Sequence, residues 1–295
     1  MKGFRGPNGK WVQSIRHSPT RVPLVIPCGQ CRGCRLERSR QWAVRCLHEA
    51  QLWPSNCFIT LTYAPEFLPP NGSLVLSHFQ NFMKRLRKKY GANIRFFHCG
   101  EYGSKLQRPH YHACLFNFDF DDKKLWKVKN GQKLFTSASL SSLWPYGWST
   151  VGSVTFESAA YVARYILKKV NGDLAEDHYS TVDCDGVVGS RLPEYVTMSR
   201  RPGIASGWFE KVGSDVFPAD EVIIRGRSCR PPRFYDNRLK MCDPSAFEII
   251  HVKRVKLAKK HLDNSTPQRL AIRYEVLKAS LRKLPRPYES DLDHA

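Results

Sequence analysis

Two histidines separated by a single residue are the first side chains in the sequence that could do chemistry together. His110 and His112 begin a stretch with strand character, residues 110–118. Residues two apart in a strand project from the same face of the sheet. Glu101 closes an earlier candidate strand, 94–101, and a hairpin between the two would bring its carboxylate beside both imidazoles. Two imidazoles and one carboxylate are typical of an open divalent-metal site, with positions left for water and a phosphate oxygen.

Two tyrosines follow at helical spacing. Tyr161 and Tyr165 are four residues apart in a predicted helix, so their hydroxyls emerge from one face. Each is followed three residues later by a cation, Arg164 and Lys168. A phenol is a weak nucleophile at neutral pH because its ordinary pKa is ~10, and it needs a cation on the phosphate and a nearby basic side chain. The pattern therefore predicts phosphoryl transfer through a covalent phosphotyrosine, which a later 3′ hydroxyl can reverse without ATP. The alternative is a pair of core aromatics.

A cysteine cluster lies near the start of the chain. Cys28, Cys31 and Cys34 have the spacing of a metal-binding loop, and tetrahedral Zn²⁺ would need a fourth ligand. We take Cys46 as that ligand. His48 and Cys57 are further candidates. The alternative is three reduced thiols in a tight turn, whereas an iron–sulfur cluster lacks any other sign of redox work.

The charge of the chain indicates a polyanionic partner. Its 295 residues include 47 Lys and Arg against 26 Asp and Glu, a formal net charge of +21. Arg, Trp and Tyr are interspersed as in nucleic-acid grooves, which favours DNA binding over a merely solvated lysine surface. We expect DNA contacts from five arginines: Arg38, Arg45, Arg164, Arg200 and Arg201.

The sequence contains neither a signal peptide nor a run of ~18 apolar residues, which predicts a cytoplasmic protein without a membrane partner. Its ten cysteines should then be metal ligands or free thiols. We find no phosphate-binding loop of the Gly-x4-Gly-Lys-Ser/Thr type, so DNA unwinding and synthesis would fall to a host helicase and polymerase.

The elements that must position these residues predict an α+β fold, a largely antiparallel sheet flanked by helices. Hydrophobic periodicity indicates helices capped by Ser77 and Ser158. Gly91 ends the first of these, and 119–148 reads as less regular. The predicted helices are 36–52, 77–90 and 159–170, and the predicted strands are 57–63, 94–101, 110–118 and 150–156. The predicted divisions are a Cys-rich basic arm and helix, a catalytic core and a basic C-terminal region, at 1–52, 53–175 and 176–295.

Several segments together resemble the replication initiation proteins of gokushoviruses, a branch of the Microviridae, within the HUH endonuclease superfamily. The segments are PCGQCRGCR, SRQWAVRC, FITLTY, CGEYGSKLQRPHYH, YVARYILKK, MSRRPGIASGW and PPRFYD. The resemblance implies an HUH (ferredoxin-like) core and a rolling-circle initiator that nicks single-stranded origin DNA with Mg²⁺ or Mn²⁺.

The resemblance also assigns roles to individual residues. It makes Glu101, His110 and His112 the metal ligands, Tyr161 and Tyr165 the nucleophiles, and Lys168 a helper cation. Tyr111 stands where the HUH pattern usually has an aliphatic residue, a mild departure.

Three other functions remain in view. A non-enzymatic, zinc-containing nucleic-acid-binding regulator would explain the charge and the cysteines, but not the histidines or tyrosines. An iron oxygenase with two histidines and one carboxylate would not explain the charge. A single-tyrosine relaxase or transposase is closer in chemistry, but two equivalent tyrosines argue against it.

Overall fold

The computed structural model describes residues 2–5, 11–12, 24–25, 27–103, 106–129, 131–164, 169–170, 172, 174–182 and 185–282. The chain divides into two compact units, Met1–Arg38 and Ser39–Ala295. The first contains β1 (Lys2–Arg5), β2 (Trp11–Val12) and β3 (Leu24–Val25), which form a small antiparallel sheet in the order β2-β1-β3.

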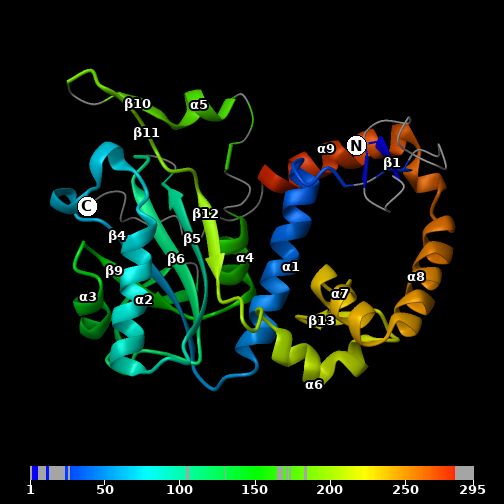
Figure 1. Ribbon diagram of the computed structural model, residues 1–295, viewed down its shortest axis with the longest axis horizontal. Helices are drawn as coiled ribbons and strands as arrows, with labels where there is room; N and C mark the ends of the chain where they lie inside the picture. Colours follow the sequence, from blue (N-terminus) through cyan, green and yellow to red (C-terminus); the bar gives the residue numbers. More distant parts are fainter. Residues whose placement is uncertain are drawn as a thin grey trace. The chain divides into compact units, whose positions relative to one another are not determined.

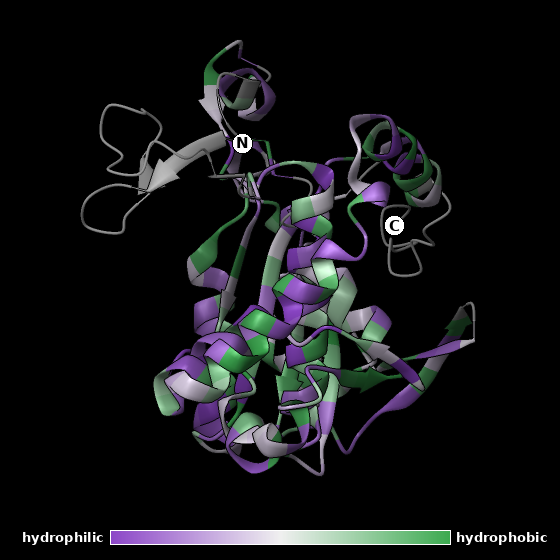
Figure 2. Cartoon of the chain, turned by 90° about the vertical axis from the view of Figure 1, so that its right-hand side faces the viewer, coloured by the Kyte–Doolittle hydropathy of each residue, from purple (hydrophilic) through white to green (hydrophobic). Residues whose placement is uncertain are grey.

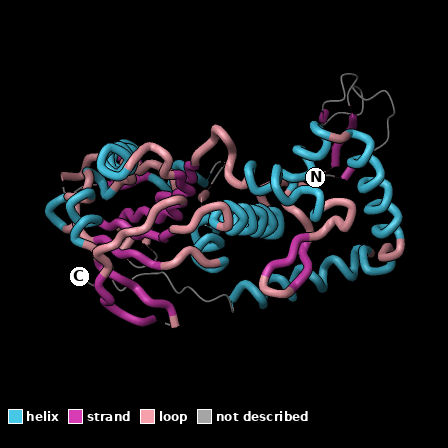
Figure 3. Tube along the Cα trace, turned by 90° about the horizontal axis from the view of Figure 1, so that it is seen from below, coloured by secondary structure: helices cyan, strands magenta, loops and turns pink. Residues whose placement is uncertain are grey.

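The second unit is built on a seven-stranded antiparallel sheet in the order β12-β5-β6-β4-β9-β8-β7. The strands are β4 (Asn56–Thr62), β5 (Arg95–Tyr102), β6 (Pro109–Phe116), β7 (Lys124–Lys129), β8 (Gln132–Thr136), β9 (Ser149–Gly152) and β12 (Tyr195–Met198). Strands and helices are distinguished in Figure 3. The predicted α+β class with a largely antiparallel sheet is confirmed.

Helices cover both faces of this sheet (Figure 1). The helices are α1 (Arg32–Ala50), α2 (Leu76–Tyr90), α3 (Ala138–Leu143), α4 (Phe156–Arg164), α5 (Leu174–Tyr179), α6 (Ser206–Val216), α7 (Arg233–Cys242), α8 (Pro244–Lys259) and α9 (Pro267–Arg282). Two small hairpins pair β10 (Ser180–Val182) with β11 (Val188–Ser190) and β13 (Val222–Ile224) with β14 (Arg227–Cys229).

Alternation along the central strands divides the core into two clusters. Phe58 of β4 packs with α4 and the buried part of α1, whereas Ile59 and Leu61 pack with α2 and α3. This follows from the two-residue period of a strand, and it makes β4 apolar throughout because both of its faces are covered. The helices alternate between hydrophobic and hydrophilic residues along their length, as one-sided burial requires (Figure 2).

The sequence predicts the long helices well but misplaces their starts. Ser77 and Ser158 lie inside α2 and α4 rather than capping them. The N–H of Ser158 donates to Thr155 Oγ1 at 3.2 Å, and the N–H of Thr155 donates to Ser158 Oγ at 2.8 Å. This reciprocal capping box makes Thr155 the cap of α4. Gly91 does end α2, with φ at 106°.

Two parts of the sheet depart from the sequence prediction. The stretch 119–148, expected to be less regular, contains the β7–β8 hairpin and α3. Strand β12 pairs with β5 although it lies beyond residue 175, so the catalytic sheet recruits a strand from the predicted C-terminal region. Helix α1 also crosses the boundary between the two compact units, so the units differ from the predicted divisions.

No helix in the part of the chain that the structure describes combines the length and apolar character needed to span a bilayer.

Trp144 anchors the α2 side of the core, so its truncation should destabilise the fold. It is fully buried, and its indole N–H donates to the carbonyl of Thr62 at 2.8 Å. Trp144→Ala should lower the free energy of unfolding by about 3–5 kcal/mol, because it leaves a cavity and an unpaired carbonyl. Trp126→Ala, at a site 46% exposed, is the matched control. Equal losses for both variants in urea unfolding would contradict this assignment of the core.

Candidate functional site

The pairing of β5 with β6 brings the predicted ligands onto one face of the sheet. Glu101 lies directly opposite His110, and Cys99 lies opposite His112. The side chains of Glu101, His110 and His112 are 3%, 4% and 1% exposed. The predicted hairpin and the common orientation of the two histidines are confirmed, while Tyr111 packs in the opposite, α2-side cluster.

His110 is held in a defined tautomer. Its Nδ1–H donates to the carbonyl oxygen of Arg108 at 2.7 Å. A carbonyl can only accept, so the proton resides on Nδ1 and the lone pair on Nε2. Backbone orientation of this kind is how metal-binding histidines are usually fixed. His110 therefore presents Nε2 as its ligand atom.

His112 is oriented by contacts at both of its ring nitrogens. Its Nε2 lies 2.8 Å from Glu101 Oε1, and its Nδ1 lies 3.0 Å from Thr60 Oγ1. Because the carboxylate accepts, Nε2–H donates to Glu101. Phe58 stacks on the ring at a centroid distance of 5.8 Å. If Nε2 gives up its proton to take a cation, Nδ1–H can donate to Thr60 instead.

Tyr161 reaches this group from α4. Its hydroxyl donates to Glu101 Oε1 across 3.4 Å, and its ring meets the His112 ring edge-on at 5.1 Å between centroids. Tyr161 is 4% exposed. The other predicted nucleophile, Tyr165, and the predicted helper cation, Lys168, lie outside the described residues.

The three donors match a divalent cation in chemical type. Imidazole nitrogen together with carboxylate oxygen suits Mn²⁺ and related first-row ions, and the carboxylate also suits Mg²⁺. The His110 and His112 rings are almost coplanar, with centroids 6.5 Å apart. In the described part of the chain, the ligand atoms of these three residues do not gather within 4.8 Å of one another. Side-chain rotation would therefore be needed for Glu101, His110 and His112 to share one ion.

The cysteine loop is more tightly gathered. The ligand atoms of Cys28, Cys31 and Cys34 all lie within 4.8 Å of one another, a group that could hold a metal ion. The backbone N–H of Cys31 donates to Cys28 Sγ at 3.2 Å and lowers the pKa of Cys28 to about 6. Cys28 is therefore largely thiolate at neutral pH, the form that binds metals.

Cys46, the predicted fourth ligand, is not brought to this group. It is fully buried in the apolar cluster with Phe97 and Cys114. Twelve residues also separate it from Cys34 along α1, a rise of roughly 18 Å. Its surroundings raise the pKa of its thiol well above the ordinary value, chiefly through burial. Cys57 is also buried in apolar surroundings, and His48 is stacked on Trp208.

The predicted DNA-contacting arginines have different surroundings. The guanidinium of Arg45 lies between Trp42 and Phe234, at 4.0 and 3.9 Å from the ring centroids, and donates twice to the carbonyl of Ile204. Burial lowers the pKa of Arg45 to about 10. The prediction for Arg45 is therefore corrected: this side chain connects elements of the core and is not presented to a phosphate.

The other four arginines stay available to solvent to differing degrees. Arg38 is exposed and Arg164, the last described residue of α4, is partly exposed. Arg200 and Arg201 are exposed and line one cavity.

Sequence reasoning missed the residues that orient the two histidines. Thr60 lies opposite His112 on β4, and the Arg108 carbonyl fixes His110. Period-two alternation from Phe58 would have placed Thr60 and Thr62 on the histidine face, but only the strand order shows that β4 lies next to β6.

The buried carboxylate, paired histidines and tyrosine on an antiparallel sheet belong to a known class of protein. Residues 56–170, from the start of β4 to beyond the described part of α4, match a family model described as replication-associated protein ORF2. The chain belongs to this family of phage replication-associated proteins.

Three relatives show how far the similarity extends. Replication-associated protein VP4 of Bdellovibrio phage phiMH2K is 34% identical over 270 residues, 88% of this chain and 81% of the relative. Replication-associated protein ORF2 of Spiroplasma virus 4 is 34% identical, covering 80% of this chain and 75% of the relative. Replication-associated protein ORF4 of Chlamydia phage 1 is 32% identical, covering 76% of this chain and 56% of the relative. No solved structure matches the chain.

If the histidine face holds the cation, its orienting hydroxyl should matter. Thr60→Val removes the partner of His112 Nδ1 and should weaken Mn²⁺ binding about 10- to 100-fold in calorimetric titration. His112→Ala should weaken it further. Thr150→Val is the matched control, because Thr150 lies opposite Thr60 on β9 and is also buried. Unchanged affinity in Thr60→Val and His112→Ala would place the Mn²⁺ site elsewhere.

Proposed function

We propose that this protein initiates rolling-circle replication of phage DNA by nicking one strand of the origin and forming a covalent link to it. The observation that carries the proposal is the chain of contacts from the Tyr161 hydroxyl to Glu101 and on to His112. A nucleophile, a carboxylate and an imidazole are the groups required for phosphoryl transfer. The three relatives are named replication-associated proteins, which supports the same biological process.

Nicking exchanges one phosphate ester for another. The Tyr161 oxygen attacks the scissile phosphorus, a tyrosine–phosphate bond forms, and the bond from phosphorus to the 3′ oxygen breaks. The Tyr161 proton passes to a nearby base, and Glu101 is the carboxylate already accepting its hydrogen bond. The leaving 3′ oxygen takes up a proton and departs as a free hydroxyl. The new 5′ end stays attached to the protein.

Glu101, His110 and His112 would hold Mg²⁺ or Mn²⁺, which when bound withdraws charge from the phosphate under attack. The chain's own groups have the remaining tasks. Thr60 and the Arg108 carbonyl keep the imidazoles oriented. Arg164 lies three residues after Tyr161 at the end of the described helix and can balance developing negative charge.

Rejoining reverses the same reaction, and the second tyrosine makes it repeatable. When one tyrosine is linked to DNA, the other can attack the regenerated origin while the displaced 3′ hydroxyl releases the first linkage. Tyr165 would supply that second hydroxyl, with Lys168 as its helper cation. Host helicase and polymerase would unwind and copy the template.

The burial of the site adds a requirement for movement. Glu101, His112 and Tyr161 are each less than 5% exposed. A scissile phosphate can reach them only if the segments covering the sheet face shift when DNA binds.

Substitution of the tyrosines tests the proposal. Tyr161→Phe with Tyr165→Phe should abolish cleavage of a labelled single-stranded origin oligonucleotide in Mn²⁺, because no phenol remains to attack. Each single variant should keep some cleavage but lose repeated rounds of replication. His112→Ala should slow cleavage at least about 100-fold. Tyr102→Phe, on the same strand as Glu101, is the aromatic control and should cleave normally.

Normal cleavage by the double tyrosine variant would exclude the tyrosine mechanism. Intact DNA binding with no cleavage in any form of the protein would favour the zinc-containing, non-enzymatic DNA-binding regulator instead. Cleavage that depends on one tyrosine alone, with the other dispensable for replication, would favour a single-tyrosine enzyme.

We also propose that Cys28, Cys31 and Cys34 bind a structural Zn²⁺. The support is their close grouping and the lowered pKa of Cys28. Because Cys46 is buried elsewhere, the fourth position would be filled by a group other than Cys46.

Elemental analysis tests the zinc proposal. The purified protein should contain about one zinc per chain, and Cys28→Ser with Cys31→Ser should remove it without abolishing cleavage by the core. Cys242→Ser, at an exposed cysteine outside the cluster, is the control and should keep the zinc. A folded protein that lacks zinc when purified without chelators would contradict the proposal.

A further inference from the structure

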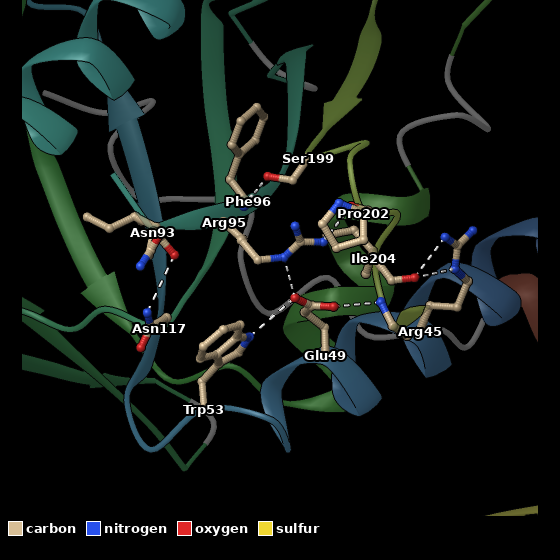
Figure 4. Close-up of polar contacts among 12 residues, drawn as sticks. Arg45, Glu49, Trp53, Asn93, Arg95, Phe96, Asn117, Ser199, Pro202 and Ile204 are labelled. Carbon is tan, nitrogen blue, oxygen red and sulfur yellow. Dashed lines mark hydrogen bonds and ion pairs between the residues drawn. The ribbon is translucent and has the colours of Figure 1, made fainter. Parts of the chain in front are cut away.

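A second basic concavity lies in the sheet-containing unit, at the end of β5 opposite to Glu101. It encloses about 700 Å³ and is lined by four segments: the end of α1 with the residues after it, the α2–β5 connection, the residues after β12, and α6. Figure 4 shows the polar contacts that join these segments. Neither the nicking chemistry nor the cysteine loop uses this cavity.

A buried carboxylate organises the cavity. Glu49 is 1% exposed and accepts hydrogen bonds from Arg95 Nε at 2.5 Å, Trp53 Nε1 at 3.2 Å and the backbone N–H of Ala205 at 2.6 Å (Figure 4). Arg95 also donates to the carbonyl of Pro202 at 2.8 Å. Three donors satisfy the carboxylate and hold the indole of Trp53 in place, so this part of the cavity is preorganised.

The remaining charge around the cavity is positive. Its lining contains five cationic side chains and one carboxylate. Arg95 pairs with that carboxylate, whereas Arg200, Arg201 and Lys211 are exposed. These three have no acidic partner among the residues that the structure describes. A concave surface with an excess of unpaired cations attracts an anion.

The size of the cavity and its aromatic wall favour a nucleotide over a simple ion. Its volume lies within the roughly 300–1,000 Å³ of typical small-molecule sites. Trp53 offers an indole fixed through its N–H, and stacking of a base on such a ring is tolerant of sequence. A base can enter a pocket only when it is not held in a duplex, which favours single-stranded DNA.

The position of the cavity suits the same DNA strand that reaches the histidine face. Arg95 and Glu101 are six residues apart on β5 and therefore project from the same face, roughly 20 Å from each other. At the ~3.4 Å rise of a DNA strand this distance corresponds to about six nucleotides, and to fewer when the strand is stretched.

We propose that this cavity binds one nucleotide of single-stranded DNA a few nucleotides from the cleaved phosphate. Arg200, Arg201 and Lys211 contact the phosphates, and Trp53 stacks on the base. The inference rests on the proposed function for its substrate, but it concerns binding and not cleavage. It assigns origin recognition to a surface separate from the nucleophile.

Salt-dependent binding tests the phosphate contacts. The probe is a fluorescein-labelled 15-mer of thymidine, titrated with the full chain in EDTA between 50 and 300 mM NaCl so that no cleavage occurs. The triple variant Arg200→Ala, Arg201→Ala, Lys211→Ala should bind at least about tenfold more weakly at low salt. Because each lost phosphate contact removes ~0.7 from the slope of log affinity against log salt, the slope should fall by about 2. The matched control carries Lys253→Ala, Lys256→Ala and Lys259→Ala on the exposed face of α8 and should keep the wild-type slope.

Photocrosslinking locates the base on the unmodified protein. A 15-mer of thymidine containing one 5-iodouracil should crosslink to the peptide that contains Trp53, and the triple variant should lose this product. Equal weakening by the triple variant and the α8 control, or crosslinks only outside the cavity, would overturn the proposal. Because both assays omit the catalytic metal, a protein that binds here but never nicks would contradict the proposed function alone.

Discussion

The pairing of β5 with β6 is the constraint on which the site depends. It sets Glu101 opposite His110 and places His112 within reach of the same carboxylate. A slip of one residue would send both imidazoles to the α2 side and Tyr111 to the α4 side. The register resists such a slip because both faces are buried: Cys114 packs on one side, and Leu115 on the other. Core packing thus fixes the positions of the polar groups that carry the chemistry.

A strongly basic protein here buries two carboxylates on one face of a single strand pair. Glu49, near the start of β5, is satisfied by a guanidinium, an indole N–H and a backbone N–H, and so joins segments distant in sequence. Glu101, near the end of β5, is contacted by an imidazole and a phenol, groups that can exchange protons or bind a cation. The difference in partners separates a carboxylate that organises a binding cavity from one suited to catalysis.

Much of the fold and site follows from local patterns in the sequence. The His-x-His spacing, the hairpin and the tyrosine helix depend on periodicity, and the structure places His112, Glu101 and Tyr161 in contact as expected. Predictions that depended on tertiary contacts were less successful. A basic helix predicted exposure for Arg45, but Trp42 and residues nearly two hundred positions away enclose it. Cys46 was chosen by ligand type, and only the packed core shows that it is buried. The cavity beside Trp53 joins four segments, and no single stretch of sequence indicates it.

Peptide mapping of the trapped protein–DNA product tests the central claim most directly. The protein is incubated with single-stranded origin DNA and Mn²⁺, quenched with denaturant, and digested with nuclease and protease. The account predicts a nucleotide phosphate on Tyr161 in some molecules and on Tyr165 in others, with neither product formed after His110→Ala with His112→Ala. A covalent product on any other residue, or cleavage that leaves no covalent product, would contradict it.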